Sequence, residues 1–204
     1  MSTQRNINTD PAAPAKPPLY DTADHYGLIS RFNHWLGAAL VLVLLGIGLY
    51  FEDMPKGPDK LYWMKLHIAI GALAFLLLAF RIGWRLVSTG PRAFAQAAAL
   101  QYLTRAVHIV LLLGIGILIV SGPFAVWTGG RAIEVFGWFA LPSPTGEMRD
   151  LHELLETVHV VTAKVMLVAI ILHVIGAFKH LIFEPERLGR IIGRIVVNGE
   201  KSSR

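Results

Sequence analysis

The sequence predicts an all-α fold, an integral membrane four-helix bundle. The chain has 204 residues, of which 54% are hydrophobic, and its mean hydropathy is +0.52. These values are too apolar for an ordinary soluble domain of this length. Four separate apolar runs are each long enough to cross the hydrocarbon core of a bilayer, which is about 30 Å thick. The sequence therefore indicates one membrane domain.

Composition excludes several classes of partner and cofactor. The net charge of +5 does not predict a nucleic-acid partner, because the basic residues flank apolar runs and do not form a soluble patch. They indicate membrane lipid instead. The chain has no cysteine, which excludes disulfides, iron–sulfur clusters, thiolate nucleophiles and covalent haem attachment. Any haem is therefore held non-covalently, with histidine as the expected ligand.

Three regions follow one another along the chain. Residues 1–30 are polar and rich in proline, which predicts a disordered or loosely docked tail without a cleavable signal. Residues 31–183 form the membrane domain, and residues 184–204 form a basic segment with one short surface helix at 188–197. Within the domain, helices are predicted at residues 31–51, 61–87, 102–127 and 150–183.

Orientation follows from the distribution of Lys and Arg. Thirteen of them lie in the N-terminal tail, the second connection and the C-terminal segment, against five in the first and third loops. Positively charged loops stay in the cytoplasm. Both termini are therefore predicted to be cytoplasmic, and the first and third loops to lie on the outer side.

The last helix carries the residues around which the chain is organised. Its histidines lie at positions 152, 159, 173 and 180, so the gaps are seven, fourteen and seven residues. Seven residues of α-helix turn about 700°, which leaves all four on roughly one face. His159 and His173 are separated by about 21 Å along the axis. Two imidazoles on one face, one near each membrane surface, suit two stacked metal centres.

Depth in the membrane pairs these histidines with two others. His34 opens the first helix on the cytoplasmic side, at the depth of His173. His67 lies early in the second helix on the outer side, at the depth of His159. For any one of them, the alternative is an interfacial or core histidine bonded to a carbonyl. Four at matching depths favour ligation.

The residue one turn after each of these histidines is small. A haem plane lies close along the helix that ligates it, so a bulky residue there would collide with the ring. The four following residues are Ala38, Gly71, Ala163 and Ala177. Small residues also serve helix packing in membranes. The remaining histidines are nevertheless followed by larger residues, so this feature separates the two sets.

Several motifs together resemble the bacterial cytochrome b561 family of four-helix di-haem membrane proteins. They are HW at residues 34–35, KLHIAIG and RIGWRL in the second helix, FGWFALPSP in the third loop, and two histidines fourteen residues apart followed by KH. The likeness covers residues 28–194. It implies two b-type haems with bis-histidine ligation by His34/His173 and His67/His159, a bacterial inner-membrane location, and electron exchange with ubiquinone or another quinone. One branch of the family also oxidises superoxide on the outer side.

The resemblance has one departure, at the end of the last helix. Family members often have paired histidines there, whereas this chain has Lys179, His180 and Leu181. His180 and His108 are the candidates for contact with a quinone. For His108 the alternatives are a haem propionate or a plain interfacial position, and for His180 a snorkelled interfacial one.

Other polar residues have predicted roles of their own. His152 is expected to be solvated, because acidic residues flank it. Lys164 lies within the fourth helix and is expected to pair with an acid or to snorkel outward. Arg81 and Arg85 are candidates for propionate contacts, although arginines at a cytoplasmic helix end usually set topology and bind lipid headgroups.

The predicted function is transmembrane electron transfer between an outer donor and a quinone. Two axial histidines leave no open position on the iron, so outer-sphere electron transfer is expected and oxygen binding is not. The donor is a small molecule, with superoxide as one candidate, or a protein. An alternative is the cytochrome b subunit of a membrane hydrogenase or dehydrogenase. A haem-free transporter or scaffold with proton-carrying histidines is the alternative from another class.

Overall fold

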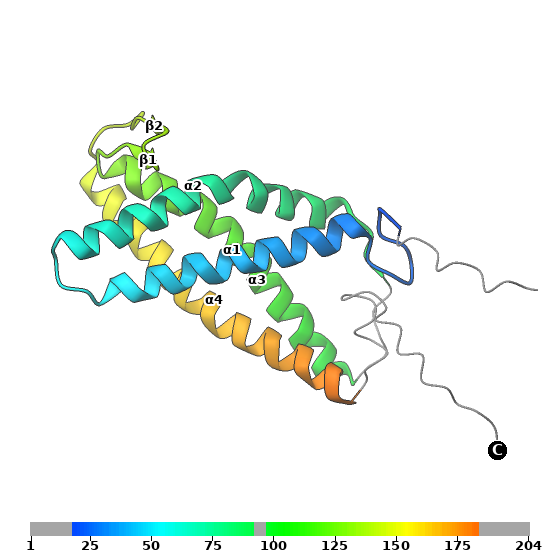
Figure 1. The fold of residues 1–204 in the computed structure, drawn as a ribbon. Coiled ribbons are helices and arrows are strands. Elements are labelled where there is room, and N and C mark those ends of the chain that lie inside the picture. The colour runs from blue at the N-terminus through cyan, green and yellow to red at the C-terminus, as the bar shows by residue number, and fades with distance from the viewer. Residues whose placement is uncertain (1–17, 92–96, 184–204) are drawn as a thin grey trace, which may run out of the picture.

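The computed structural model describes residues 18–91 and 97–183, with side chains up to Lys179. Four helices run alternately up and down (Figure 1), and each is long and apolar enough to cross a membrane. This arrangement confirms the predicted all-α membrane bundle. The elements in order are α1 (Leu28–Glu52), α2 (Pro58–Val87), α3 (Ala98–Thr128), β1 (Ile133–Val135), β2 (Phe139–Leu141) and α4 (Arg149–Phe183).

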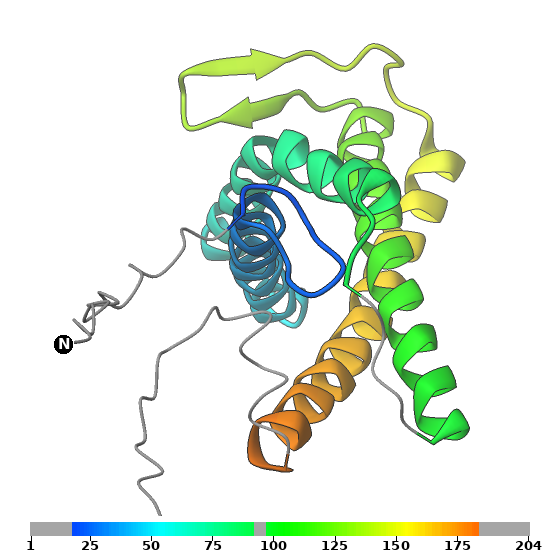
Figure 2. The same cartoon turned by 90° about the vertical axis from the view of Figure 1, so that its right-hand side faces the viewer.

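The helices form two antiparallel pairs. Figure 1 and Figure 2 show α1 beside α2 and α3 beside α4, with α2 against α3 joining the pairs. A buried apolar layer lies at mid-height between them, made by Ala74, Leu78, Ile115 and Met166. We call the end of the bundle that carries β1 and β2 the hairpin end. The opposite end, where α1 begins and α4 ends, is the terminal end.

The helix boundaries differ slightly from those predicted. Helix α1 begins at Leu28, three residues before the predicted start, and α2 begins at Pro58. Proline suits a first helical turn, because its fixed φ matches the helix and its missing N–H is not needed there. Helix α3 continues through Pro123 to Thr128.

Residues 18–27, predicted as part of the tail, form an ordered loop against the end of α2. Asp21 Oδ2 accepts a hydrogen bond from Ser30 Oγ at 2.8 Å, and Trp84 Nε1 donates to the same hydroxyl at 2.7 Å. The ring of Tyr20 stacks on Trp84 with the centroids 6.1 Å apart. The loop therefore fixes the terminal end of α1 onto α2. Residues 28–30 of the predicted tail begin α1, and residues 1–17 and the predicted segment 184–204, with its surface helix, lie outside the described residues.

A two-stranded hairpin that the sequence did not predict closes the other end. Strands β1 and β2 pair antiparallel, with Ile133 opposite Leu141. Val135 is fully buried and Ile133 is nearly so, and both pack against Val126 of α3. Gly137, with φ of 74°, supplies the positive backbone angle that this tight connection requires. The hairpin thus covers the ends of α2 and α3.

Candidate functional site

The first histidine pair lies near the hairpin end and joins α2 to α4. The ring centroids of His67 and His159 are 6.1 Å apart, with the rings nearly perpendicular at 86°. Phe51, from the last turn of α1, packs edge-on against His67 at 5.7 Å. We call His67 and His159 the hairpin pair. The two imidazoles meet edge to face near the hairpin end.

The second pair lies near the terminal end and joins α1 to α4. The ring centroids of His34 and His173 are 6.2 Å apart. We call these two residues the terminal pair. A third imidazole, His108 of α3, lies against His173 with the centroids 5.3 Å apart. His108 thus borders this site. This position is compatible with its predicted contact with a quinone or a haem propionate.

Both pairs have the spacing that a metal between two imidazoles requires. A coordinated imidazole nitrogen lies about 2 Å from the metal, which places two axial rings about 6 Å apart centre to centre. Among the described residues, no group of three or more histidine or acidic side chains gathers to hold a metal ion. Two protein ligands suit a tetrapyrrole, which itself supplies four nitrogens to the iron. The donor set therefore fits haem.

A serine and a glycine of α3 support the ring of His159. Ser121 Oγ lies 3.0 Å from His159 Nδ1, and this serine is only 2% exposed. A Cβ on the next residue, Gly122, would lie 3.2 Å from His159 Cε1, so the ring sits directly on the helix backbone. Hydrogen bonds to the second ring nitrogen fix the tautomer and the orientation of a metal-bound histidine. Ser121 is placed to do this for His159.

The opposite ring of this pair also rests on a glycine. A Cβ on Gly48 of α1 would lie 3.5 Å from His67 Cε1. A Cβ at Gly122 would be tighter than ordinary contact and would require a small shift of the His159 ring, whereas a Cβ at Gly48 would make ordinary van der Waals contact with His67. Gly122, more than Gly48, therefore gives its histidine ring room.

The terminal pair has a charged neighbour instead. Arg81 of α2 places Nη2 3.1 Å from His34 Nδ1 and donates through Nη1 to the carbonyl of Asn33 at 3.2 Å. Its side chain crosses α1 at Gly37, where a Cβ would lie 2.9 Å from Arg81 Cδ. Gly37 therefore forms a notch that seats the arginine.

An apolar layer separates the two pairs. Met166 lies seven residues after His159 and seven before His173 on α4, and it is 1% exposed. Its side chain occupies the space left by Gly114 of α3, where any Cβ would overlap the Met166 side chain. The sites are thus divided by tightly packed, buried apolar side chains.

Comparison with known proteins identifies the chain's relatives. A family model described as prokaryotic cytochrome b561 matches residues 25–194. The chain belongs to that family. It is 28% identical over 183 residues to cytochrome b561 homolog 2 of Escherichia coli (strain K12). The aligned region covers 85% of this chain and 94% of that protein. Family membership and the four membrane-spanning helices make it a multi-pass membrane cytochrome that binds b-type haem and transfers electrons.

The other residues predicted for this cytochrome are placed as follows. A Cβ on Gly71 would meet only Leu44 Cδ2, at 3.9 Å, so space remains beside His67. Ala177 lies exposed on α4, one turn beyond His173. Arg85 is exposed, and its guanidinium lies close to Gly90. The side chain of His180 lies outside the described residues.

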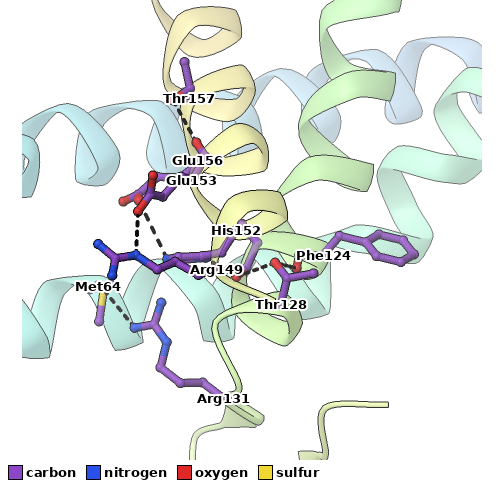
Figure 3. A network of polar contacts seen from close by, with 10 residues as sticks. Met64, Phe124, Thr128, Arg131, Arg149, His152, Glu153, Glu156 and Thr157 are labelled. Carbon is purple, nitrogen blue, oxygen red and sulfur yellow. Dashed lines mark hydrogen bonds and ion pairs between the residues drawn. The ribbon is translucent and has the colours of Figure 1, made fainter. Parts of the chain in front are cut away.

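Two predictions about α4 have different outcomes. Lys164 pairs with Glu52 of α1 at 2.7 Å, which confirms the expected acid partner. The prediction that His152 is solvated is wrong. Its Nδ1 lies 2.8 Å from the carbonyl of Ala125 on α3, and a Cβ on Gly129 would lie 3.2 Å from its ring. His152 is thus a structural link between α4 and α3, drawn near the centre of Figure 3.

The surface beside the hairpin pair carries cations that are mostly paired. Arg149 contacts Glu153 at 3.1 Å, and Lys65 contacts Glu134 at 3.3 Å. Arg131 reaches Met64 Sδ at 3.7 Å (Figure 3). Paired cations create little net field for steering an anion.

Sequence reasoning missed Ser121, Gly48, Gly122 and the contact of Arg81 with His34. A signal existed for the first: Ser121, Gly122 and Pro123 interrupt an otherwise apolar helix, and a polar residue inside a membrane helix usually has a specific partner. The partner itself was not predictable from spacing, because it lies on another helix.

Proposed function

We propose that the chain carries single electrons across the membrane between two b-type haems, one held by each histidine pair. The observation that carries this proposal is the repetition of one geometry. Two facing imidazole pairs, with centroids 6.1 and 6.2 Å apart, share α4 and are separated by fourteen residues. Fourteen residues rise about 21 Å, a distance that spans most of the hydrocarbon core.

The residues of each site hold and insulate the redox centre. Each haem, when bound, supplies a one-electron ferric/ferrous couple. Imidazoles from two helices would hold each haem from both sides, which would leave its iron without an open position for oxygen. In the tautomer that carries its proton on Nδ1, His159 donates a hydrogen bond to Ser121 Oγ, and its Nε2 is free to ligate. The layer around Met166 excludes water between the sites and favours passage of electrons without protons.

We place the terminal end in the cytoplasm, because the positively charged segments gather there. Quinone is the proposed substrate at this end. Its reduction to quinol takes two electrons, delivered one at a time, and two protons. His108 is the titratable side chain that borders His173, so it is our candidate for transferring a proton. His180, one heptad beyond His173, is the second candidate for contact with the quinone headgroup.

The proposed donor acts on the outer side, at the hairpin pair. Superoxide would give up one electron and leave as oxygen, which needs no open iron site. Two of the five cations in the proposed outer loops, Lys65 and Arg149, are paired with carboxylates. A generic small-molecule or protein donor therefore has more support than superoxide does.

An absorption spectrum of the purified, dithionite-reduced protein tests the proposal. We expect sharp α- and β-bands of low-spin haem and two haems per chain by pyridine haemochrome titration. His67→Ala or His159→Ala should remove one haem, His34→Ala or His173→Ala the other, and His152→Ala neither. A spectrum without haem bands would instead favour the haem-free transporter.

Stopped-flow reduction identifies the donor. If superoxide is the substrate, the oxidised protein is reduced rapidly, and the rate falls as salt screens the anion's approach. Added soluble quinone should then reoxidise it. If reduction by superoxide is slow and independent of salt, the chain is instead an electron carrier for a protein partner, such as a hydrogenase or dehydrogenase. His180→Ala should impair reoxidation and leave reduction intact; normal rates in both steps would exclude His180 from the quinone site.

A further inference from the structure

We infer that Arg81 makes the terminal site the more easily reduced of the two, and so directs electrons from the hairpin end to the terminal end. This inference rests on the proposed two-haem function and adds to it the residue that sets the direction of electron flow. It assigns Arg81 as a positioning residue that acts through charge. The arginine itself is not a ligand.

The position of Arg81 is fixed by α1 as much as by its own helix. Nη1 donates to the carbonyl of Asn33, the residue before the ligand candidate His34, and Nη2 lies 3.1 Å from His34 Nδ1. The Gly37 notch receives the aliphatic part of the side chain. A permanent positive charge is therefore seated against the terminal pair by three separate contacts.

Within residues 18–91 and 97–183, no carboxylate lies within ion-pair distance of Arg81. A partly buried cation without an anion is costly, since water no longer solvates it fully. Addition of an electron to the adjacent site lowers that cost, because it reduces the local positive charge by one unit. Arg81 thus favours the reduced state of the terminal site.

Among the side chains that the structure describes, the hairpin pair has no comparable charge in contact with it. Its neighbours are the hydroxyl of Ser121, the ring of Phe51 and two glycines, all of them neutral. The two sites therefore share their donor atoms and differ in charge. One electron leaves the centre held by His67 and His159, which is oxidised, and reduces the centre held by His34 and His173; no bond breaks and no proton moves.

The contact with His34 also sets a condition on ligation. Arginine N–H groups only donate, so Nδ1 of His34 accepts in this arrangement. A neutral ring that ligates through Nε2 carries its proton on Nδ1. Ligation therefore requires Nη2 to release His34, while Nη1 stays on the Asn33 carbonyl and the charge stays at this end. If His34 instead ligated as an imidazolate, its negative charge would cancel that of Arg81, and the direction would not follow.

Potentiometric titration of the haem-loaded full chain tests the inference. The hairpin site is removed by His159→Ala, so that the terminal couple is titrated alone, and the measurement is repeated with both sites present. Arg81→Gln should shift the terminal reduction equilibrium toward the oxidised form about tenfold, which is 59 mV for a one-electron couple. The hairpin couple should not move. Arg81→Lys keeps the charge and should restore most of the potential.

Two further variants separate charge from damage to the fold. Gly37→Ala displaces Arg81 without changing any charge, so it should lower the terminal midpoint; Gly46→Ala, on the same helix with no atom within 4 Å of a new Cβ, should not. Arg85→Gln removes an exposed charge one turn along α2, where water screens it, and should have a much smaller effect.

Each outcome decides the inference. A terminal midpoint that is unchanged or raised in Arg81→Gln overturns it, and so does an equal shift in Arg85→Gln. If Arg81→Gln loses the terminal haem, Gly37→Ala still measures the effect of displacing the charge, and Arg81→Lys shows whether a cation alone retains the potential. Failure of the proposed function is distinguishable, because wild-type protein would then contain no haem. Two haems of equal midpoint, insensitive to Arg81, would refute only the direction.

Discussion

Ser121 Oγ lies 3.0 Å from Nδ1 of His159, across the interface between α3 and α4. Helix α3 supplies none of the four proposed ligands, yet this contact gives it control over one of them. Loss of such an outer contact typically costs about 10–100-fold in metal affinity or activity. The consequence is testable without any change to the ligands.

We predict that Ser121→Ala weakens haem retention at the hairpin pair about tenfold and leaves the terminal haem in place. The reason is that His159 then loses the acceptor that fixes its tautomer. Haem loss to an excess of apomyoglobin, followed by absorbance, measures this. Thr104→Ala is the matched control, since that hydroxyl on the same helix bonds only to the carbonyl of Leu100. Equal retention in both variants would remove Ser121 from the site.

Bulky residues beside the proposed ligands should expel haem selectively. Gly71→Leu should lower occupancy at the hairpin pair and Ala177→Leu at the terminal pair, since overpacking costs about 1–3 kcal/mol. Haem content and redox midpoints measure the effect. Gly176→Leu is the control for Ala177, because a Cβ there meets no atom within 4 Å. Full haem content and unchanged midpoints in both test variants would contradict the packing hypothesis.

Met166→Ala should destabilise the protein by about 2 kcal/mol or more, because it empties a nearly fully buried volume between the helices. Both haems should be retained, as no ligand or ligand contact changes. Denaturant unfolding of the loaded protein in one detergent measures the loss. Met148→Ala serves for comparison, because that side chain is 44% exposed. A similar stability of the two variants would show that the layer around Met166 is not the core of the bundle.

The ion pair between Lys164 and Glu52 should be recoverable by exchanging the charges. Lys164→Glu and Glu52→Lys each place two like charges together, so each should lower the Tm of the loaded protein. The double variant should regain most of the loss. A double-mutant cycle at low and high salt isolates the pair, whose attraction weakens with salt. Additive effects without recovery would mean that the contact between α1 and α4 is not held by this pair.

The sequence predicted the helices well and the cross-helix contacts poorly, for a physical reason. Each membrane helix satisfies its own backbone, so an apolar run of sufficient length determines it locally. The β1–β2 hairpin was missed because three-residue strands are too short to show an alternating pattern. Spacing likewise placed His159 and His173 on one face of a helix. It could not reveal Ser121 or Arg81, which reach their histidines from other helices.

His152 is a residue for which a contact from another helix made the sequence-based prediction wrong. Its acidic neighbours in the sequence suggested water, but the fold brings the carbonyl of Ala125 to its ring. Neighbours along the chain therefore predicted the wrong environment. For Lys164, the position inside an apolar helix was enough to predict either an acidic partner or outward snorkelling. The structure shows the acidic partner, Glu52 of α1.

The two histidine pairs cross the same seam. Helix α1 packs on α2 and α3 on α4, and each pair takes one ring from the first two helices and the other from α4. Binding of haem by both histidine pairs would therefore connect the α1–α2 pair to the α3–α4 pair at two further points. A chain without haem would keep its four spans and the packing of α2 on α3, but it would lose both links between α4 and the first two helices that the histidine pairs provide.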